Sequence, residues 1–346
     1  MRSARLATAV TIMVVGLLGA TPAVGVPPTP HPAVSCRDLS IPVTLGAGQP
    51  LYLMGGRLCV PAGATVLQIL VPGFTYSSDY WDFPYEPDRY SYVRAANTAG
   101  FATLSIDRPG TGSSALPPSQ LPPAAALTVD SEADALHQVL TALPAVTGGN
   151  RFARTMLVGH SLGATESAIV AARFPGDVDG VILTSDLHST PSLGADDPNH
   201  PAAEEPKFAG YPAGYVTTRK GVRGPLFYDT DYADPKVIAE DDKRKSVGTI
   251  SELATGNDVS GSPTVSQGIS VPVLLVVGRN DRIYCAQYRS CADAEAVLTH
   301  ERGYYTAAPE LDAFVLPDAG HSINLHPNAP DWFDAAMKWT TDHVGH

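Results

Sequence analysis

One segment of the chain constrains its fold more than any other. An apolar run at residues 155–158 leads into Gly-His-Ser-Leu-Gly at residues 159–163, and an alanine-rich stretch with helical spacing follows at residues 164–173. This order predicts a buried strand, a sharp turn and a helix, with the Gly-x-Ser-x-Gly pentapeptide at the turn. The flanking glycines allow a tight turn, and the helix behind it directs backbone N–H groups toward negative charge that develops at the serine. Ser161 is therefore a candidate nucleophile; the alternative is an ordinary glycine-bounded turn between a strand and a helix.

A serine nucleophile needs a general base, most often a histidine, which is oriented by a carboxylate. Two later apolar runs are followed by such residues: Asp281 comes after residues 271–278, and His321 comes after residues 313–316. Because open α/β sheets place their sites at the carboxyl ends of the strands, both side chains are expected beside Ser161. The chain order Ser, Asp, His is typical of hydrolases that carry this pentapeptide.

Five stretches of the sequence resemble motifs of the α/β-hydrolase superfamily. They are residues 70–74, 106–113, 159–163, 277–281 and 319–321, in the order of the family. The resemblance implies a mostly parallel α/β-hydrolase sheet flanked by helices, with an inserted cap or lid domain, in a secreted bacterial protein similar to serine esterases. It also implies that the backbone N–H groups of Phe74 and Leu162 form an oxyanion hole. Pro72 stands where many relatives have histidine, which leaves these backbone donors in place.

Strand and helix patterns alternate along most of the chain, which predicts a mostly parallel sheet covered on both faces. The expected strands are residues 51–60, 66–71, 102–106, 155–158, 178–185, 271–278 and 313–316, and the expected helices include residues 90–99 and 129–143. The core is therefore assigned to residues 36–186 and 270–346. Between these parts the alternation stops, so residues 187–269 are predicted to form the cap or lid, with helices at residues 235–244 and 249–255. The alternative, a long unstructured loop, is uncommon at this length.

The first 25 residues have the pattern of a secretory signal peptide. Arg2 and Arg5 precede an apolar run at residues 6–20, and small residues follow. This pattern predicts cleavage near residue 25. A retained anchor is the alternative, but the run is short for a membrane span, so no stable membrane insertion is expected after cleavage. A proline-rich linker is predicted at residues 26–35.

The four cysteines fit an exported protein in an oxidising compartment. The simplest pairing joins Cys36 to Cys59 and Cys285 to Cys291, although the sequence alone permits three pairings. No histidine lies at ligand spacing near either pair, so no zinc site is predicted.

An aromatic segment is expected to form a wall of the pocket. Residues 74–85 carry six aromatic side chains in twelve positions, directly after the turn that contains Phe74. Tyr76, Tyr80 and Trp81 are the candidates for contact with substrate, and packing in the core is the alternative for most of these rings. A second group of aromatics in residues 187–269 is predicted either to line the pocket or to form a small core of that segment; they are Phe208, Tyr211, Tyr215, Phe227, Tyr228 and Tyr232.

Other side chains compete for the roles in the triad. Asp186 follows an expected strand and is the alternative acid, and His188 is close enough to that strand end to face the pocket. His326 would be the base only if the loop after His321 were arranged differently. His160 is interpreted as a packing residue behind the turn, and Glu166 as a helix residue that points away from the site.

These features predict a secreted serine hydrolase that cleaves a carboxylic ester or lactone of a hydrophobic substrate through an acyl-enzyme, without a metal or organic cofactor. The formal net charge of −12 and the lack of a basic patch make nucleic acids and anionic membranes poor partners. One alternative is an exported aminopeptidase or amidase, in which an acidic residue of the cap would hold a substrate amine; the candidates are Glu204, Glu205, Asp229, Asp231 and Asp234, which could equally form a solvated surface. An alternative of another class is a ligand-binding protein without turnover. The sequence makes no prediction of the oligomeric state.

Overall fold

The computed structural model describes residues 33–346 except 150–151, 190–191, 195, 261 and 286–290. The predicted signal peptide and most of the predicted linker lie outside the described residues. The first strand begins at Val34, so the last two residues of the stretch expected as linker are part of the sheet.

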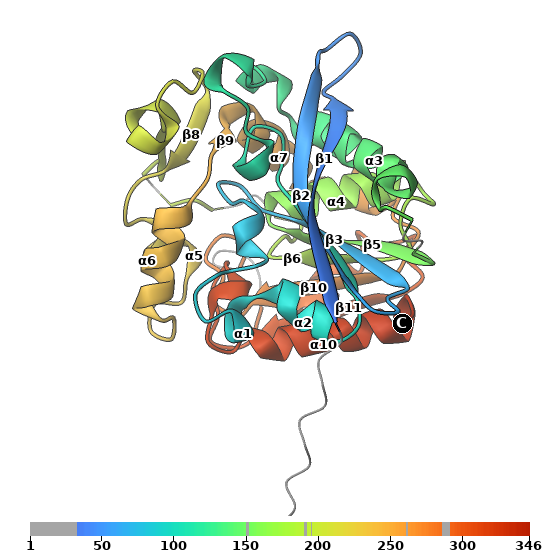
Figure 1. Cartoon of the computed structure of the whole chain (residues 1–346). Helices are drawn as coiled ribbons and strands as arrows, with labels where there is room; N and C mark the ends of the chain where they lie inside the picture. The colour runs from blue at the N-terminus through green and yellow to red at the C-terminus, as the bar shows by residue number, and fades with distance from the viewer. Residues whose placement is uncertain (1–32, 150–151, 190–191, 195, 261, 286–290) are drawn as a thin grey trace, which may run out of the picture. The chain divides into compact units, whose positions relative to one another are not determined.

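An eight-stranded sheet forms the centre of the described structure, with strand order β1-β2-β4-β3-β5-β6-β10-β11 (Figure 1). The strands are β1 (Val34–Thr44), β2 (Leu51–Pro61), β3 (Val66–Val71), β4 (Ala102–Ile106), β5 (Arg154–His160), β6 (Val181–Thr184), β10 (Val273–Gly278) and β11 (Leu311–Leu316). β2 pairs antiparallel with β1 and β4, and all pairs from β4 to β11 are parallel. β3 and β10 are buried along their whole length, as expected for apolar strands covered on both faces. The predicted fold class, a mostly parallel α/β sheet, is confirmed.

Helices cover both faces of this sheet. α3 (Val129–Val146) and α4 (Leu162–Arg173) lie on one face, and α2 (Tyr92–Thr98) and α10 (Ala329–His343) lie on the other (Figure 1). α3 begins at Thr128, whose side chain forms a reciprocal capping box with Ser131. The Tyr92 ring stacks on Trp332 with ring centroids 5.0 Å apart, which joins α2 to α10.

The remaining helices are short. They are α1 (Pro87–Tyr90), α5 (Arg223–Phe227), α6 (Pro235–Arg244), α7 (Ile250–Ser260), α8 (Pro263–Ser266) and α9 (Ala294–Glu301), with 3-10 turns at Ser78–Tyr80, Gly112–Ser114, Pro118–Gln120, Ala124–Ala126, Ala202–Glu204, Pro206–Phe208 and Ile323–Leu325. The helix expected over residues 90–99 is divided between α1 and α2, because Ser91 has extended backbone angles and caps α2.

Residues 187–269, which we call the insertion, contain structure that the sequence patterns only partly predict. The helix expected at residues 235–244 is α6, and the second expected helix is α7. The insertion also contains an antiparallel sheet of β7 (Asn199–Pro201), β8 (Tyr215–Thr218) and β9 (Gly248–Thr249), which was not predicted. Strands this short carry no readable alternation of apolar and polar residues.

Both expected disulfides are present. Cys36 is bonded to Cys59 and Cys285 to Cys291. The first joins residues that face each other in the β1–β2 register. The second closes the loop that follows Asp281.

Within the part of the chain that the structure describes, no helix has both the length and the apolar character needed to cross a membrane.

The close contact between β5 and α4 gives a test of the fold. A Cβ atom at Gly159 would lie 2.3 Å from the Gly163 carbonyl oxygen and 2.5 Å from Ala164 Cα. Gly159→Ala is therefore expected to lower the free energy of unfolding by about 2 kcal/mol or more, because backbone on both sides must move. Denaturant unfolding measures the change. In Gly303→Ala, the matched control, the added methyl meets open space, and the expected change is within about 0.5 kcal/mol. A Gly159→Ala protein as stable as the control would contradict this account.

Candidate active site

Ser161 lies at a strained turn between β5 and α4. Its backbone has φ 52° and ψ −122°, a pair of angles that residues other than glycine rarely adopt. The Ser161 N–H donates to the Thr184 carbonyl at 2.8 Å, which fixes the turn to the end of β6. At Gly163 an added Cβ would lie 2.5 Å from the Val71 carbonyl oxygen, so the first turn of α4 is pressed against the end of β3. The sequence places glycine where this packing leaves no room for a side chain.

His321 and Asp281 form a buried hydrogen-bonded pair. His321 Nδ1 lies 2.9 Å from Asp281 Oδ2, and both side chains are almost fully buried. The other carboxylate oxygen of Asp281 accepts backbone N–H groups of Ile283 at 2.8 Å and Tyr284 at 3.2 Å. An acceptor at Nδ1 favours the tautomer that carries its proton there, so the Nε2 lone pair is available as a base.

The turn after β3 lies against the serine turn. A Cβ at Gly73 would lie 3.0 Å from the His160 carbonyl oxygen and 3.1 Å from Ser161 Cβ. Thr75, two residues later, has φ 58°. Phe74 and Leu162, the expected oxyanion donors, therefore belong to two adjacent turns, and both line the same pocket as Ser161 and His321.

The pocket is an apolar cavity of about 60 Å³. Core elements and the insertion both contribute to its walls. The core residues are Phe74, Tyr76, Ser161, Leu162, Thr165, Ile283, Tyr284 and His321. The insertion residues are Leu193, Pro198, Asn199, Thr218, Leu226, Phe227, Leu253, Gly256 and Asn257. Among the described lining residues there is no aspartate, glutamate, lysine or arginine.

Only one of the three aromatic candidates for substrate contact reaches this pocket. Tyr76 lines it, and its hydroxyl lies 2.6 Å from Ser322 Oγ. Tyr80 instead stacks on His160 with ring centroids 4.2 Å apart, and Trp81 packs edge-on against Tyr80. The expectation for Tyr80 and Trp81 is therefore corrected: the 3-10 turn at Ser78–Tyr80 directs both rings into the core.

The pocket wall is supported by a buried ion pair that sequence reasoning missed. Arg223 of α5 is fully buried, and its Nε donates to Asp241 of α6 at 2.8 Å. The guanidinium carbon lies 4.1 Å from the centre of the Tyr76 ring and 5.0 Å from that of Phe227. The Asp241 carboxylate also accepts the Tyr228 hydroxyl at 2.8 Å. Arg223 and Asp241 are 18 residues apart and lie on different helices, so no periodic pattern within one element reports their contact.

The alternative acid and base have other partners. Asp186 accepts the Thr165 hydroxyl at 2.9 Å, and burial raises its pKa to about 6. His188 lies between Glu301, 2.6 Å from its Nδ1, and Ser266, 2.7 Å from its Nε2. Asp281 is thus the carboxylate bonded to His321, and His188 ties the insertion to α9.

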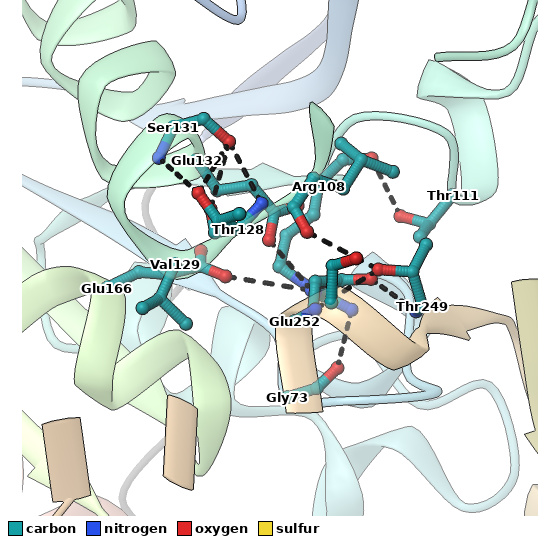
Figure 2. Close-up of polar contacts among 12 residues, drawn as sticks. Gly73, Arg108, Thr111, Thr128, Val129, Ser131, Glu132, Glu166, Thr249 and Glu252 are labelled. Carbon is teal, nitrogen blue, oxygen red and sulfur yellow. Dashed lines mark hydrogen bonds and ion pairs between the residues drawn. The ribbon is translucent and has the colours of Figure 1, made fainter. Parts of the chain in front are cut away.

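His160 and Glu166 are structural, as expected, but Glu166 has charged partners. Burial lowers the pKa of His160 well below its usual range. Its Nδ1 is hydrogen-bonded to Thr184 Oγ1 at 3.1 Å. Glu166 is buried beside Arg108 in a cluster of charged side chains (Figure 2). Within the described residues, no group of three or more His, Cys, Asp or Glu side chains is arranged to hold a metal ion.

A sequence model of the alpha/beta hydrolase family matches residues 68–335. No curated protein matches the sequence. The structure is similar to that of a thermophilic esterase from Thermogutta terrifontis, with a TM-score of 0.60 and 18% identity over 88% of this chain and 98% of that one. It is also similar to a monoacylglycerol lipase from Paleococcus ferrophilus, with a TM-score of 0.56 and 16% identity over 90% and 100% of the two chains. It is similar, too, to an esterase from Pyrococcus furiosus, with a TM-score of 0.55 and 16% identity over 89% of this chain and 92% of that one. At these identities the likeness shows a shared fold.

His326 gives the site a pH-dependent support. Its Nε2 accepts the N–H groups of Gly320 at 3.0 Å and Asp229 at 3.1 Å, and its Nδ1 donates to the Ser322 carbonyl at 3.0 Å. Burial lowers the pKa of His326 to about 4. Folding therefore requires the neutral ring: its stabilisation is complete above pH 6.5, where the unfolded ring is also neutral, and is lost as the pH falls to about 4.

His326→Gln removes this titration. The variant is expected to be less stable than wild type at pH 7.5, and the gap should shrink by about 3 kcal/mol at pH 4, because only wild type then has a histidine that resists protonation. Urea unfolding of both proteins at the two pH values measures the gap, and the other titrating groups cancel in the difference. A gap of the same size at both pH values would show that His326 does not titrate in this way.

Proposed function

The chain belongs to the alpha/beta hydrolase family, and on that premise we propose that it is a serine hydrolase that cleaves a carboxylic ester or lactone of a hydrophobic substrate. The observation that carries the proposal is the buried hydrogen bond between His321 and Asp281, in the pocket that Ser161 lines at a strained turn. These three side chains supply the nucleophile, the base and the carboxylate that acyl transfer to water needs.

In the proposed mechanism, Ser161 Oγ attacks the carbonyl carbon of the substrate while His321 Nε2 takes the hydroxyl proton. The imidazolium that forms is stabilised by the Asp281 carboxylate. When the tetrahedral intermediate collapses, His321 gives its proton to the leaving alkoxide, and an alcohol departs from the acyl-enzyme. A water molecule then attacks the acyl carbon, and His321 takes a proton from it. Collapse of this second intermediate releases the carboxylic acid and returns the proton to Ser161.

Negative charge develops on the carbonyl oxygen in both intermediates. In the proposal, the backbone N–H groups of Phe74 and Leu162 bind this oxygen. Leu162 is the first residue of α4, so the helix dipole adds to the stabilisation. A donor of this kind lowers the barrier by about 3–4 kcal/mol when it is aligned before the reaction.

The substrate class follows from the pocket wall. Leu193, Leu226, Phe227, Leu253 and Ile283 supply apolar surface, which fits an uncharged acyl chain or ring. The insertion contributes about half of the lining residues, and we therefore propose that it acts as the cap of the site. The aromatic residues Phe208, Tyr211 and Tyr215 pack on one another instead, which supports a small core within the insertion.

The charges around the pocket favour an ester over a peptide with a free amine. Glu205 of the insertion is bonded to Lys245 at 2.7 Å and to His200 at 2.9 Å. Asp229 accepts the side-chain amide of Asn280. Neither carboxylate is among the residues that line the pocket. An aminopeptidase would need such a group beside the scissile bond, to hold the substrate amine.

The proposal includes export. The pattern of residues 1–25 predicts cleavage of a signal peptide, and two disulfides suit an oxidising compartment. Mass spectrometry of the protein recovered from the medium of an expressing bacterial culture would locate its N-terminus.

Turnover of a series of chromogenic acyl esters, from acetate to long chain, tests the reaction class. Wild type is expected to hydrolyse the series with an optimum set by the apolar wall, and Ser161→Ala is expected to lose about 10⁴-fold or more in kcat. Cleavage of aminoacyl amides without cleavage of esters would favour the amidase. Tight ligand binding with no turnover of either would favour a binding protein.

The assignment of the acid has its own test. Asp281→Asn is expected to lower kcat about 10⁴-fold, because the asparagine favours the wrong tautomer of His321. Asp186→Asn is the matched control, since Asp186 also follows a core strand and is buried; kcat should stay within about threefold of wild type. If kcat fell about 10⁴-fold in Asp186→Asn and changed little in Asp281→Asn, Asp186 would be the acid of the triad.

A further inference from the structure

A buried arginine lies directly behind the proposed oxyanion hole. The Arg108 side chain, which follows β4, is 0% exposed and is surrounded by three carboxylates (Figure 2). Its Nη1 donates to Glu252 of α7 and lies 3.6 Å from Glu132 of α3 and 3.6 Å from Glu166 of α4. Two helices of the core and one of the insertion therefore meet at a single guanidinium.

The three carboxylates are not equivalent. Burial raises the pKa of Glu132 well above its usual range, and it raises the pKa of Glu166 to about 7. A single positive charge cannot balance three negative ones in a dry interior, so protons take up the excess charge. Glu252 makes the closest contact with Arg108: it accepts Arg108 Nη1–H and also the backbone N–H of Thr249. The nearest carboxylate partner of Arg108 therefore belongs to the insertion.

The other end of the guanidinium reaches the turn after β3. Arg108 Nη2 donates to the Gly73 carbonyl oxygen at 3.3 Å. This oxygen and the Phe74 N–H belong to one planar peptide unit, so a bond that fixes the carbonyl also fixes the direction of the N–H. A cation at the carbonyl also withdraws electron density from the peptide and makes its N–H a stronger donor.

The insertion also contacts the same turn directly. Ser246 N–H donates to the Thr75 carbonyl at 2.8 Å, and Arg223 Nη1 donates to Thr75 Oγ1 at 3.1 Å. A Cβ at Gly248 would lie 2.0 Å from Phe74 Cε2, so the ring of Phe74 lies directly on the backbone of β9. Arg108 thus contacts the peptide between Gly73 and Phe74, and the insertion contacts the Phe74 ring and Thr75.

We propose that Arg108 is a positioning residue for the oxyanion hole, and that Glu252 couples the insertion to the hole by holding the Arg108 guanidinium against the Gly73–Phe74 peptide. The inference rests on the proposed function, because it assigns the Phe74 N–H as an oxyanion donor. The proposal gives the buried charges a role: because Glu252 belongs to the insertion, the Phe74 N–H is aligned only when the insertion is in place. An insertion that moves away would take Glu252 from Arg108 and loosen the hole.

Kinetics of three variants test the positioning role. Arg108→Lys keeps the charge but loses the planar fork that spans Glu252 and Gly73, and Glu252→Gln removes the charge that holds Arg108. Both are expected to lower kcat with little change in KM, by about 10- to 100-fold for Arg108→Lys, which is less than the loss of a whole donor. Glu132→Gln is the matched control, because a group that burial keeps protonated is replaced by its neutral analogue, and its kcat should equal that of wild type.

A trifluoromethyl ketone separates this role from general support of the fold. Its adduct with a serine nucleophile places an oxyanion in the hole, whereas the alcohol product carries no charged oxygen that the hole could bind. The affinity of the ketone should fall in Arg108→Lys by the same factor as kcat, and the affinity of the product should not change. A loss of kcat that is matched by Glu132→Gln, or that comes through KM and product binding, would overturn the proposal.

A nuclear magnetic resonance measurement tests the contact without any turnover. The chain has nine phenylalanines, so labelling with ¹⁵N-phenylalanine gives a readable set of amide signals, and Phe74→Leu identifies the signal of Phe74. We expect this signal to move in Arg108→Lys and in Glu252→Gln but not in Glu132→Gln. If Arg108→Lys does not fold, Glu252→Gln decides. A Phe74 signal that stays in place in both variants would overturn the positioning role of Arg108. If the signal moves in the variants as expected but wild type cleaves no ester, only the proposed function is overturned.

Discussion

The tight contact between the serine turn and its neighbours is the constraint on which the rest of the structure depends. Ser161 has a positive φ at a turn where β5, α4 and the end of β3 pack closely. This packing requires Gly159 and Gly163, because it leaves no room for a Cβ atom at either position. Because the central strands are parallel, their carboxyl ends lie at the same edge of the sheet as this turn. Asp281 and His321 follow two more of those strands, so their side chains form a hydrogen bond although they are 40 residues apart in the sequence. His321 lines the same pocket as Ser161.

Buried charge is the second feature that shapes the site. The pairs Arg108–Glu252 and Arg223–Asp241 are almost fully removed from solvent, and both include a residue of the insertion. Burying such pairs costs about as much free energy as their attraction returns, so they are weak sources of stability. Their value is geometric: Arg108 contacts the carbonyl of Gly73, and Arg223 contacts Thr75. The insertion thereby acts on the turn that carries the proposed oxyanion donor as well as on the pocket wall.

The sequence predicted the central strands, the serine turn and the pairing of Asp281 with His321, because each depends on a local pattern or on the rule that parallel strands end at one edge. It did not predict the small sheet of the insertion, whose strands are two to four residues long. It assigned Tyr80 and Trp81 to the pocket, since a count of rings does not say which way a 3-10 turn directs them. The Arg108–Glu252 pair spans 144 residues, and only the unusual presence of charge at apolar helix positions such as Glu132 and Glu166 could have indicated it.

The proposed acyl transfer passes through a covalent intermediate on Ser161. The most direct measurement is the mass of the protein when the reaction with a chromogenic ester is stopped in acid during the first turnover, followed by peptide mapping. We expect one acyl group per chain, on the peptide that contains Ser161, and none in Ser161→Ala. An acyl group on another residue, or ester consumption with no adduct at any time, would contradict the proposed mechanism.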